Sequence, residues 1–176
     1  NERLGFGLKF GTNNFGVDEP LPLLGGKAAE GIMGTTPYKL WIEKNDPFIQ
    51  LATRIAQDQG RRRKDLLNSY FLGWANVLTI YDLLNQLVPK IGWDGINGRV
   101  LRRQLETWGK EYDLHGLVKF DYTRESRTPM LARLVEIKDG QWVPASSWRR
   151  MPGIVRSDLK VPYKEPSTPP LAKKAY

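Results

Sequence analysis

Apolar and polar residues in the first forty positions are arranged as short strands separated by turns. Residues 6–10 predict a strand that runs into a polar loop, 11–16, with the sequence GTNNFG. Residues 31–38 predict a second, buried strand whose exit is fixed by a proline. Between them, residues 18–20 (Asp-Glu-Pro) are typical of a helix start, because acids suit the helix dipole and proline tolerates the first turn. This short helix ends at glycine and is predicted to pack through Leu21, Leu23 and Leu24.

Three longer helices follow, and their apolar residues recur at helical spacing. The first begins at an Asp-Pro pair, in which Asp46 caps the helix, and it stops at Gly60. The second spans 66–88 and is closed by Pro89; it is apolar on several sides, which predicts burial between layers. The third spans 97–108. The apolar positions on one face of the first and third are Phe48, Leu51, Ala52, Ile55 and Ala56, and Val100, Leu101, Leu105 and Trp108.

The helix over 66–88 is not predicted to span a membrane. A span needs roughly 20 apolar residues, whereas polar side chains such as Asn76, Asp82 and Gln86 interrupt this run. Such groups are costly in lipid, so burial against other protein elements is the better interpretation.

The C-terminal third is predicted to be β-rich. Residues 117–122 alternate as a strand, and residues 130–138 and 141–145 form a hairpin around Asp139-Gly140. Asp-Gly between two β-rich runs is a strong hairpin signal. The last twenty residues contain four prolines and scattered lysines and predict an extended tail. Strands and helices alternate early in the chain, which predicts an α/β fold with a partly parallel sheet.

Composition excludes several kinds of chemistry. The chain has 176 residues, enough for one domain with a core, and it has no cysteine, hence no disulfide, thiolate nucleophile or cysteine-based zinc site. A single histidine, His115, argues against a histidine triad or a multi-histidine metal site. No phosphate-binding, hydrolase or metalloprotease motif is present. The sequence therefore predicts a protein that is not an enzyme and needs no cofactor or metal.

Basic residues raise a separate hypothesis. The chain carries 27 basic and 19 acidic residues, a net charge of +8, which would suit a nucleic-acid-binding domain. The basic clusters, 61–64 and 149–150, lie far apart in the sequence, and aromatic residues are not interleaved with the basic ones. Stacking aromatics usually accompany a basic groove for single strands, so solvated loops are the favoured interpretation and no nucleic acid partner is predicted.

Trp74 and the glycine before it have two interpretations. Packing in the core is the usual role of a tryptophan in an apolar helix. Gly73, however, costs the helix roughly 1 kcal/mol relative to alanine, and such a glycine often marks a place where something approaches the backbone closely. Trp74 is therefore a candidate for contact with a ligand.

Six segments occur in an order that is specific to one protein family. They are 28–34 (AAEGIMG), 36–38 (TPY), 46–60, 70–77 (YFLGWANV), 118–121 (VKFD) and 134–144 (LVEIKDGQWVP). In this order they resemble the type I periplasmic binding proteins of the leucine/isoleucine/valine-binding kind, over about residues 5–148. Members of this family have two Rossmann-like lobes joined by three crossings, with the ligand between the lobes.

The resemblance covers only the C-terminal half of such a protein. It implies that residues 1–37 belong to the second lobe and 38–123 to the first, that 124–150 return to the second lobe, and that 151–176 form the tail. The chain begins Asn-Glu-Arg without a leader, and we expect it to be a fragment or a processed product whose missing half, or self-association, covers its open edges.

The resemblance also implies a ligand site. A polar residue in the loop after the first strand contacts the ligand, and here Asn13 and Asn14 stand at that position beside Phe15. Family members that hold a ligand amine have an acid there, and an amide carries no charge to pair with an ammonium group. This departure weakens the expectation of a branched-chain amino acid. Trp74 matches an aromatic position in the ligand-side helix and would suit an apolar or aromatic ligand body.

The function that follows is solute binding for an ABC importer. The expected solute is an amino acid or another small carboxylate, including aromatic ones, held between two hinged lobes, and the expected partner is an ABC permease. The implied location is periplasmic or extracellular, with a lipid anchor in the complete protein. The alternatives are a ligand-sensing regulatory domain of the same fold and the basic nucleic-acid-binding domain considered above.

Overall fold

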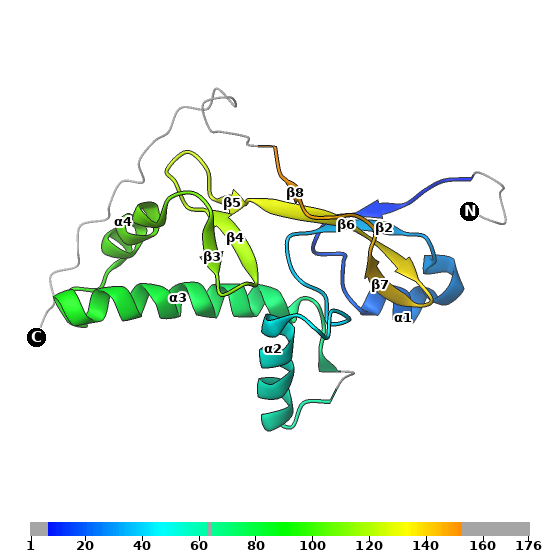
Figure 1. The fold of residues 1–176 in the computed structure, drawn as a ribbon, viewed down its shortest axis with the longest axis horizontal. Coiled ribbons are helices and arrows are strands. Elements are labelled where there is room, and N and C mark those ends of the chain that lie inside the picture. The colour runs from blue at the N-terminus through cyan, green and yellow to red at the C-terminus, as the bar shows by residue number, and fades with distance from the viewer. Residues whose placement is uncertain (1–6, 63–64, 153–176) are drawn as a thin grey trace, which may run out of the picture.

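A computed structural model describes residues 7–62 and 65–152 and has the mixed α/β architecture that the sequence predicts (Figure 1). The predicted tail over 151–176 lies outside the described residues except for its first two positions. The helices are α1 (Pro20–Gly25), the 3-10 helix η2 (Gly26–Ala29), α2 (Pro47–Asp58), α3 (Tyr70–Ile91) and α4 (Gly98–Trp108). The strands are β1 (Gly11–Thr12), β2 (Met33–Thr36), β3 (Tyr112–Leu114), β4 (Val118–Asp121), β5 (Thr128–Pro129), β6 (Leu131–Lys138), β7 (Gln141–Pro144) and β8 (Arg149–Arg150).

The larger sheet joins the two ends of the described chain. Its strand order is β1-β2-β6-β7, with β8 also paired to β6. The pair β1–β2 is parallel and the pairs β2–β6 and β6–β7 are antiparallel, so the predicted partly parallel sheet is confirmed. The predicted hairpin is confirmed as well: Asp139 and Gly140 both have positive φ, 51° and 72°, as the two central residues of a tight hairpin turn require.

The prediction of a strand over 6–10 is wrong in position. The described residues of this stretch are not in a strand, whereas Gly11 and Thr12, predicted to be loop, pair with β2. The pairing begins where the Met33 N–H donates to the Phe10 carbonyl at 3.1 Å, because β2 itself starts only at Met33. Alternation of side chains could not locate this start, since the partner strand determines it.

The smaller sheet and the long helices form a second group. Strands β3, β4 and β5 pair antiparallel, and in Figure 1 they lie with α4 along one side of α3. The hairpin β3–β4 was not predicted, although its turn residues, His115 and Gly116, both have positive φ, 53° and 79°. One buried cluster joins α2 and α3 to this hairpin, and another lies on the larger sheet. The two-lobe boundaries stay a prediction.

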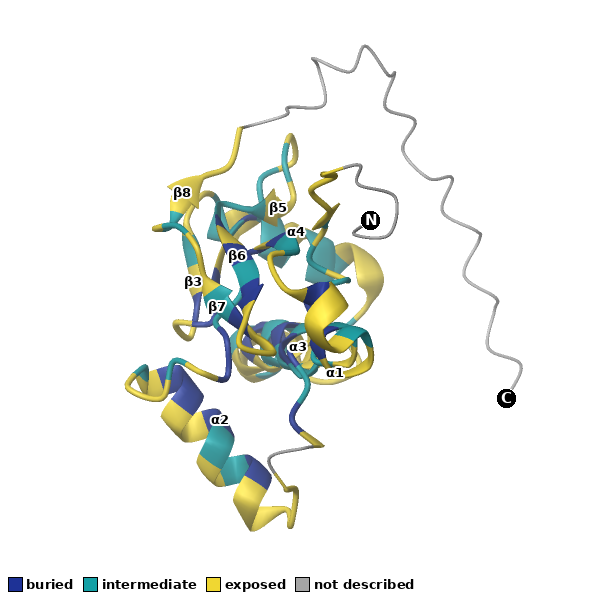
Figure 2. Ribbon diagram, turned by 90° about the vertical axis from the view of Figure 1, so that its right-hand side faces the viewer, coloured by how far each residue is buried: buried dark blue, intermediate teal, exposed yellow. Residues whose placement is uncertain are grey.

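Helix α2 follows its sequence signals. Asp46 Oδ1 accepts the N–H groups of Phe48 and Ile49, at 2.9 and 3.3 Å, so it caps the helix as predicted. Figure 2 shows one buried and one exposed side of this helix, and the fully buried residues are Phe48, Ile49, Ala52 and Ala56.

Helix α3 differs from its prediction in three ways. It begins at Tyr70 rather than at residue 66, and it continues through Pro89 to Ile91. The proline is tolerated because it lies near the end, where its missing N–H removes a single bond, and Gly92 with φ 66° ends the helix. The expected burial between layers holds for only one side within the described chain, because the other side carries exposed apolar residues. Among the described residues no helix is both long and apolar enough to cross a membrane.

Of the three leucines of α1, Leu21 packs against the cluster on the larger sheet as predicted, whereas the other two do not. Leu23 and Leu24 are 81% and 84% exposed, and within this helix only Pro22 is buried. The preceding acids also have a different role from the expected one, because they do not cap α1 with their side chains. Glu19 Oε2 accepts the Asn68 N–H at 2.6 Å, and Asp18 Oδ1 accepts the Ser69 N–H at 3.3 Å. The two carboxylates thus satisfy backbone donors at the start of α3, where the helix dipole favours negative charge.

These two acids titrate in opposite directions. Burial, followed by the hydrogen bond to Asp18, raises the pKa of Glu19 to about 8. Burial also acts to raise the pKa of Asp18, but its hydrogen bonds with Glu19 and Ser69 outweigh this and hold the pKa below its usual value. The pair therefore keeps one proton at neutral pH.

A buried ion pair fixes the segment between β2 and α2. The Arg133 side chain, 5% exposed, donates from Nη1 to Glu43 Oε1 at 2.9 Å and from Nη2 to Glu43 Oε2. Its guanidinium lies over the Trp148 ring, 4.4 Å from the centroid. Glu43 Oε2 also accepts the Leu40 N–H at 2.6 Å. The carboxylate therefore ties both the main chain near Leu40 and the start of β6 into one network.

The proton on Glu19 predicts that stability falls as pH rises from about 4.5 to about 8. Within this window native Glu19 retains a proton that the unfolded chain releases. Glu19→Gln keeps the hydrogen bonds of the protonated acid. After allowance for solvent screening, release of this proton costs the wild-type protein about 2 kcal/mol of stability at pH 9. We therefore expect the Tm of Glu19→Gln to exceed the wild-type Tm by about 4–8 °C at pH 9 and to equal it at pH 5. Calorimetry over pH 5–9 measures this, with Asp58→Asn as control; parallel curves for wild type and Glu19→Gln would contradict it.

Loss of Glu43 predicts a large destabilisation. Glu43→Ala leaves the Arg133 charge buried without its partner, which costs about 3–5 kcal/mol and lowers Tm by about 6–20 °C in a chain of this size. Arg62→Ala is the matched control, because the Arg62–Asp65 pair is solvated, with side chains 69% and 37% exposed, and is worth at most about 1 kcal/mol. Equal Tm losses in thermal unfolding would argue against a structural role for the buried pair.

Candidate functional site

The loop that contains Asn13, Asn14 and Phe15 is an exposed turn after β1. Asn13 Oδ1 accepts the Phe15 N–H at 3.1 Å, and the Asn13 carbonyl accepts the Gly16 N–H at 3.1 Å. Asn14 is half-buried and the Phe15 ring is 72% exposed. The side-chain hydrogen bond shapes the turn and leaves Asn13 Nδ2 as the donor that this residue would offer to a ligand.

Trp74 lies partly in the core and partly on a pocket. Its ring meets Phe48 edge-on, with centroids 5.6 Å apart at 82°, and Tyr70 at 6.3 Å and 69°. The same ring lines a pocket of about 590 Å³ at the start of α3, together with Tyr70, Gly73, Val77 and, from the preceding segment, Arg61. The ring therefore packs in the core on one side and borders a pocket on the other, and its contact with a ligand stays a prediction.

Gly73 faces open space. A Cβ placed on this residue would have no atom within 4 Å among its described neighbours. Close packing within the described chain therefore does not require a glycine here. Its position in the pocket wall beside Trp74 leaves the α3 backbone accessible to a molecule in that pocket.

One hydrogen bond links the segment that follows the loop to the residue before the helix that carries Trp74. The Asp18–Ser69 hydrogen bond joins a residue three positions after Phe15 to one five positions before Trp74. Among the described residues, however, no hydrogen bond or ring contact links Asn13, Asn14 or Phe15 to Trp74. The described structure therefore does not bring Trp74 into contact with the other three predicted site residues, and their assignment to one ligand stays a prediction.

A second pocket, of about 520 Å³, lies on the other side of the α1–α3 contact. Its wall is mainly apolar and includes Trp41 and Trp142, whose indole N–H groups donate to the carbonyls of Leu67 and Asp18, both at 2.9 Å. Glu19 and Asn68 add polar atoms to this wall, but Glu19 already accepts the Asn68 N–H. The polar groups serve the contact between the two helix starts, so the first pocket is the better ligand candidate.

The single histidine belongs to a side-chain cluster that sequence analysis missed. Asp82, buried on α3, accepts the Tyr112 hydroxyl at 2.8 Å and lies 2.9 Å from His115 Nε2. Burial and the bond to Asp82 raise the pKa of Tyr112 well above its usual value. The cluster ties the β3–β4 hairpin to α3. A carboxylate on the buried side of this largely apolar helix was the signal that could have indicated such an interaction.

Three described residues of the basic clusters contact neighbouring side chains. Arg61 lies over the Tyr70 ring at 5.3 Å, Arg62 pairs with Asp65, and Arg150 pairs with Glu111. Among residues 7–62 and 65–152, no group of three or more histidine, aspartate or glutamate side chains is placed to hold a metal ion.

Comparison with known proteins finds a similarity in structure but none in sequence. No family model matches the chain, and no curated protein matches it significantly in sequence. A solved structure of a branched-chain amino acid ABC transporter protein from Thermus thermophilus, with bound valine, is similar with a TM-score of 0.70 and 19% sequence identity. The similar region covers 85% of this chain and 41% of that chain. The chain therefore spans less than half the length of the protein it resembles in structure.

The match confirms the fold that the order of sequence segments implied. At 19% identity the similarity establishes the fold, not the ligand. The described chain is thus part of a type I periplasmic binding protein fold.

Proposed function

We propose that this chain is part of a solute-binding protein that serves an ABC importer. The observation that carries the proposal is the pocket at the start of α3, where Trp74 and Tyr70 stand beside a glycine that the described packing does not require. Aromatic rings with a few polar groups at their edge are typical of small-molecule sites. The shared fold supports binding rather than catalysis.

The groups around the pocket favour a small carboxylate with an apolar or aromatic body. Arg61, in the pocket wall, offers a positive charge for a carboxylate, whereas Asp65, in the same wall, is paired with Arg62. Trp74 and Tyr70 offer ring faces and edges for the body. Asn13 and Asn14 would add amide hydrogen bonds from the loop after β1 when the two lobes close on the solute. In the complete protein, the part of the fold outside this chain would supply further contacts to the solute, and an ABC permease would receive it. The implied location is periplasmic or extracellular.

Replacement of Trp74, and separately of Asn13 with Asn14, tests the site in the complete protein that contains this chain. Trp74→Ala removes the aromatic wall and is expected to weaken binding at least tenfold, and Asn13→Ala with Asn14→Ala about fivefold, since a hydrogen bond is worth about 1 kcal/mol. Isothermal titration with valine, phenylalanine and benzoate as probes, after mass spectrometry of any co-purified solute, measures this. Gln57→Ala, on the exposed side of α2, is the control. Unchanged affinity in both site variants, for a solute that binds wild type, would refute the assignment.

Gly73→Ala separates a ligand role from a structural one. The added methyl group meets no described atom, so helix propensity predicts a gain in stability of about 0.5–1 kcal/mol, or about 1–4 °C in Tm. If the solute approaches the backbone there, affinity falls while stability rises. A stabilised variant with unchanged affinity would show that the solute lies elsewhere, and a destabilised one would show that Gly73 has a packing role.

A further inference from the structure

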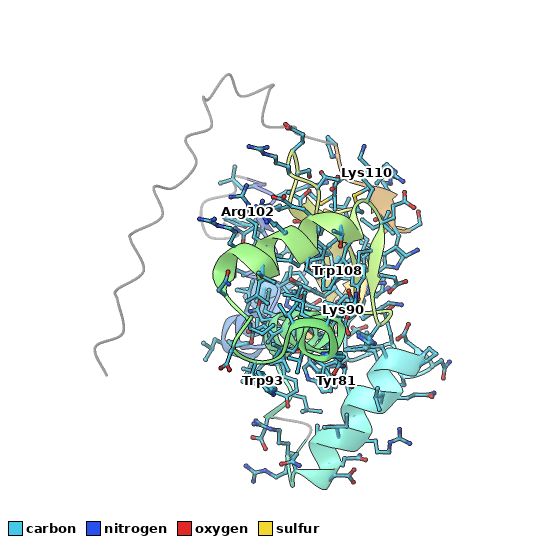
Figure 3. The ribbon with its side chains drawn as sticks, turned by 90° about the vertical axis from the view of Figure 1, so that its left-hand side faces the viewer. Tyr81, Lys90, Trp93, Arg102, Trp108 and Lys110 are labelled. Carbon is cyan, nitrogen blue, oxygen red and sulfur yellow. The ribbon has the colours of Figure 1, made fainter. Side chains whose placement is uncertain are left out.

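One face of α3 carries an apolar stripe with no described covering. Val77, Ile80 and Tyr81, at positions i, i+3 and i+4, are 65%, 56% and 56% exposed. Figure 3 shows Tyr81, and Trp93 just beyond the helix, on the side of α3 that faces away from α4. Residues three and four apart form one continuous strip on a helix surface. We refer to Val77, Ile80 and Tyr81 as the α3 stripe.

The opposite face of the same helix packs against other parts of the described chain. Phe71, Ala75 and Leu83 are buried there, and Asp82 makes its hydrogen bonds to Tyr112 and His115 on that side. A helix that is apolar on both faces is typical of an element with neighbours on both sides. Because exposed contiguous apolar surface marks interaction sites, the α3 stripe requires an occupant.

We propose that the α3 stripe packs against the part of the two-lobe fold that this chain does not span. The shared fold accounts for 85% of this chain but only 41% of the solved chain, so most of that fold lies outside the matched region. The stripe is continuous with the Trp74 pocket through Val77, which lines it. The solute would therefore be enclosed at the N-terminal end of α3, and protein would cover the helix further along.

An open sheet edge supports the same occupant independently. Within the described residues β1 pairs only with β2, in parallel, and the other edge of β1 is open. Leu8 and Phe10, just before β1, are 56% and 53% exposed. Unpaired strand edges are normally covered or extended by another strand. A polypeptide that supplies a strand beside β1 and an apolar surface over α3 would satisfy both features.

Other occupants fit less well. The α3 stripe contains no basic residue, and phosphate contacts need lysine or arginine, so nucleic acid is not favoured. A second copy would bring two chains of net charge +8 together, and self-repulsion opposes such an interface. The inference rests on the shared fold and not on the identity of the solute, so its failure and that of the proposed function are distinguishable.

The absence of cysteine from this chain provides the test. Single thiols are introduced by Ile80→Cys and, as the matched control, Gln57→Cys on the exposed side of α2. Both are placed in the complete protein, and the rate of N-ethylmaleimide labelling is measured natively and in denaturant by mass spectrometry of the labelled peptide. Light scattering gives the number of copies, and native circular dichroism verifies folding.

The expected result is a native labelling rate at Ile80→Cys at least tenfold slower than at Gln57→Cys, in a monomeric protein, with equal rates in denaturant. Equal native rates would overturn the proposal, because they would show that the stripe is open. Protection that occurs only in a dimer and disappears on dilution would also overturn it, because the occupant would then be a second copy. Tyr81→Cys provides a second reporter if Ile80→Cys disturbs the native circular dichroism signal.

Discussion

The pairing of β2 with β6 is the constraint on which the rest of the structure depends. It aligns Met33 with Glu136 and Thr36 with Arg133, so residues about a hundred positions apart in sequence become neighbours. Closing so long a loop has an entropic cost that local contacts cannot offset. The pairing closes the intervening helices and the smaller sheet into one loop, and it places Arg133 where Glu43 can reach it. The buried ion pair thus acts at the point where the chain leaves and re-enters the larger sheet.

The contact between the starts of α1 and α3 is tied to the larger sheet through Trp142 on β7, whose indole N–H donates to the Asp18 carbonyl. The acids at 18–19 accept hydrogen bonds from the N–H groups at 68–69. A carboxylate at a helix start is stabilised by the dipole, whereas two carboxylates side by side repel. The structure reconciles these effects by retaining a proton on Glu19. A contact of this kind is strong at neutral pH only while one of its two acids remains neutral.

The features that could be predicted from sequence are those whose cause is local. Asp46 caps α2 because its side chain reaches backbone donors two and three residues away, and Asp139-Gly140 turns the hairpin because both residues accept positive φ. The start of β1, the exposure of Leu23 and the open face of α3 could not be derived in this way. Each depends on which distant element lies alongside, and propensity carries no information about that. The order of family-like segments supplied the missing tertiary information, and the structural match confirms the fold it implied.

Trp74 illustrates why the site is harder to predict than the fold. Its ring packs edge-on against Phe48 inside the core and also borders the pocket, so neither burial nor exposure alone identifies its role. Gly73 is the more informative residue, because its stability penalty has no compensating contact among the described residues. A residue that weakens its own helix without improving the packing is explained only by something outside the described chain. The same reasoning applies along the helix at Val77 and Ile80, where apolar side chains face outward. In the two proposals, one face of α3 changes from a ligand wall at its start to a packing surface further along, and both proposals are based on what the described packing leaves unexplained.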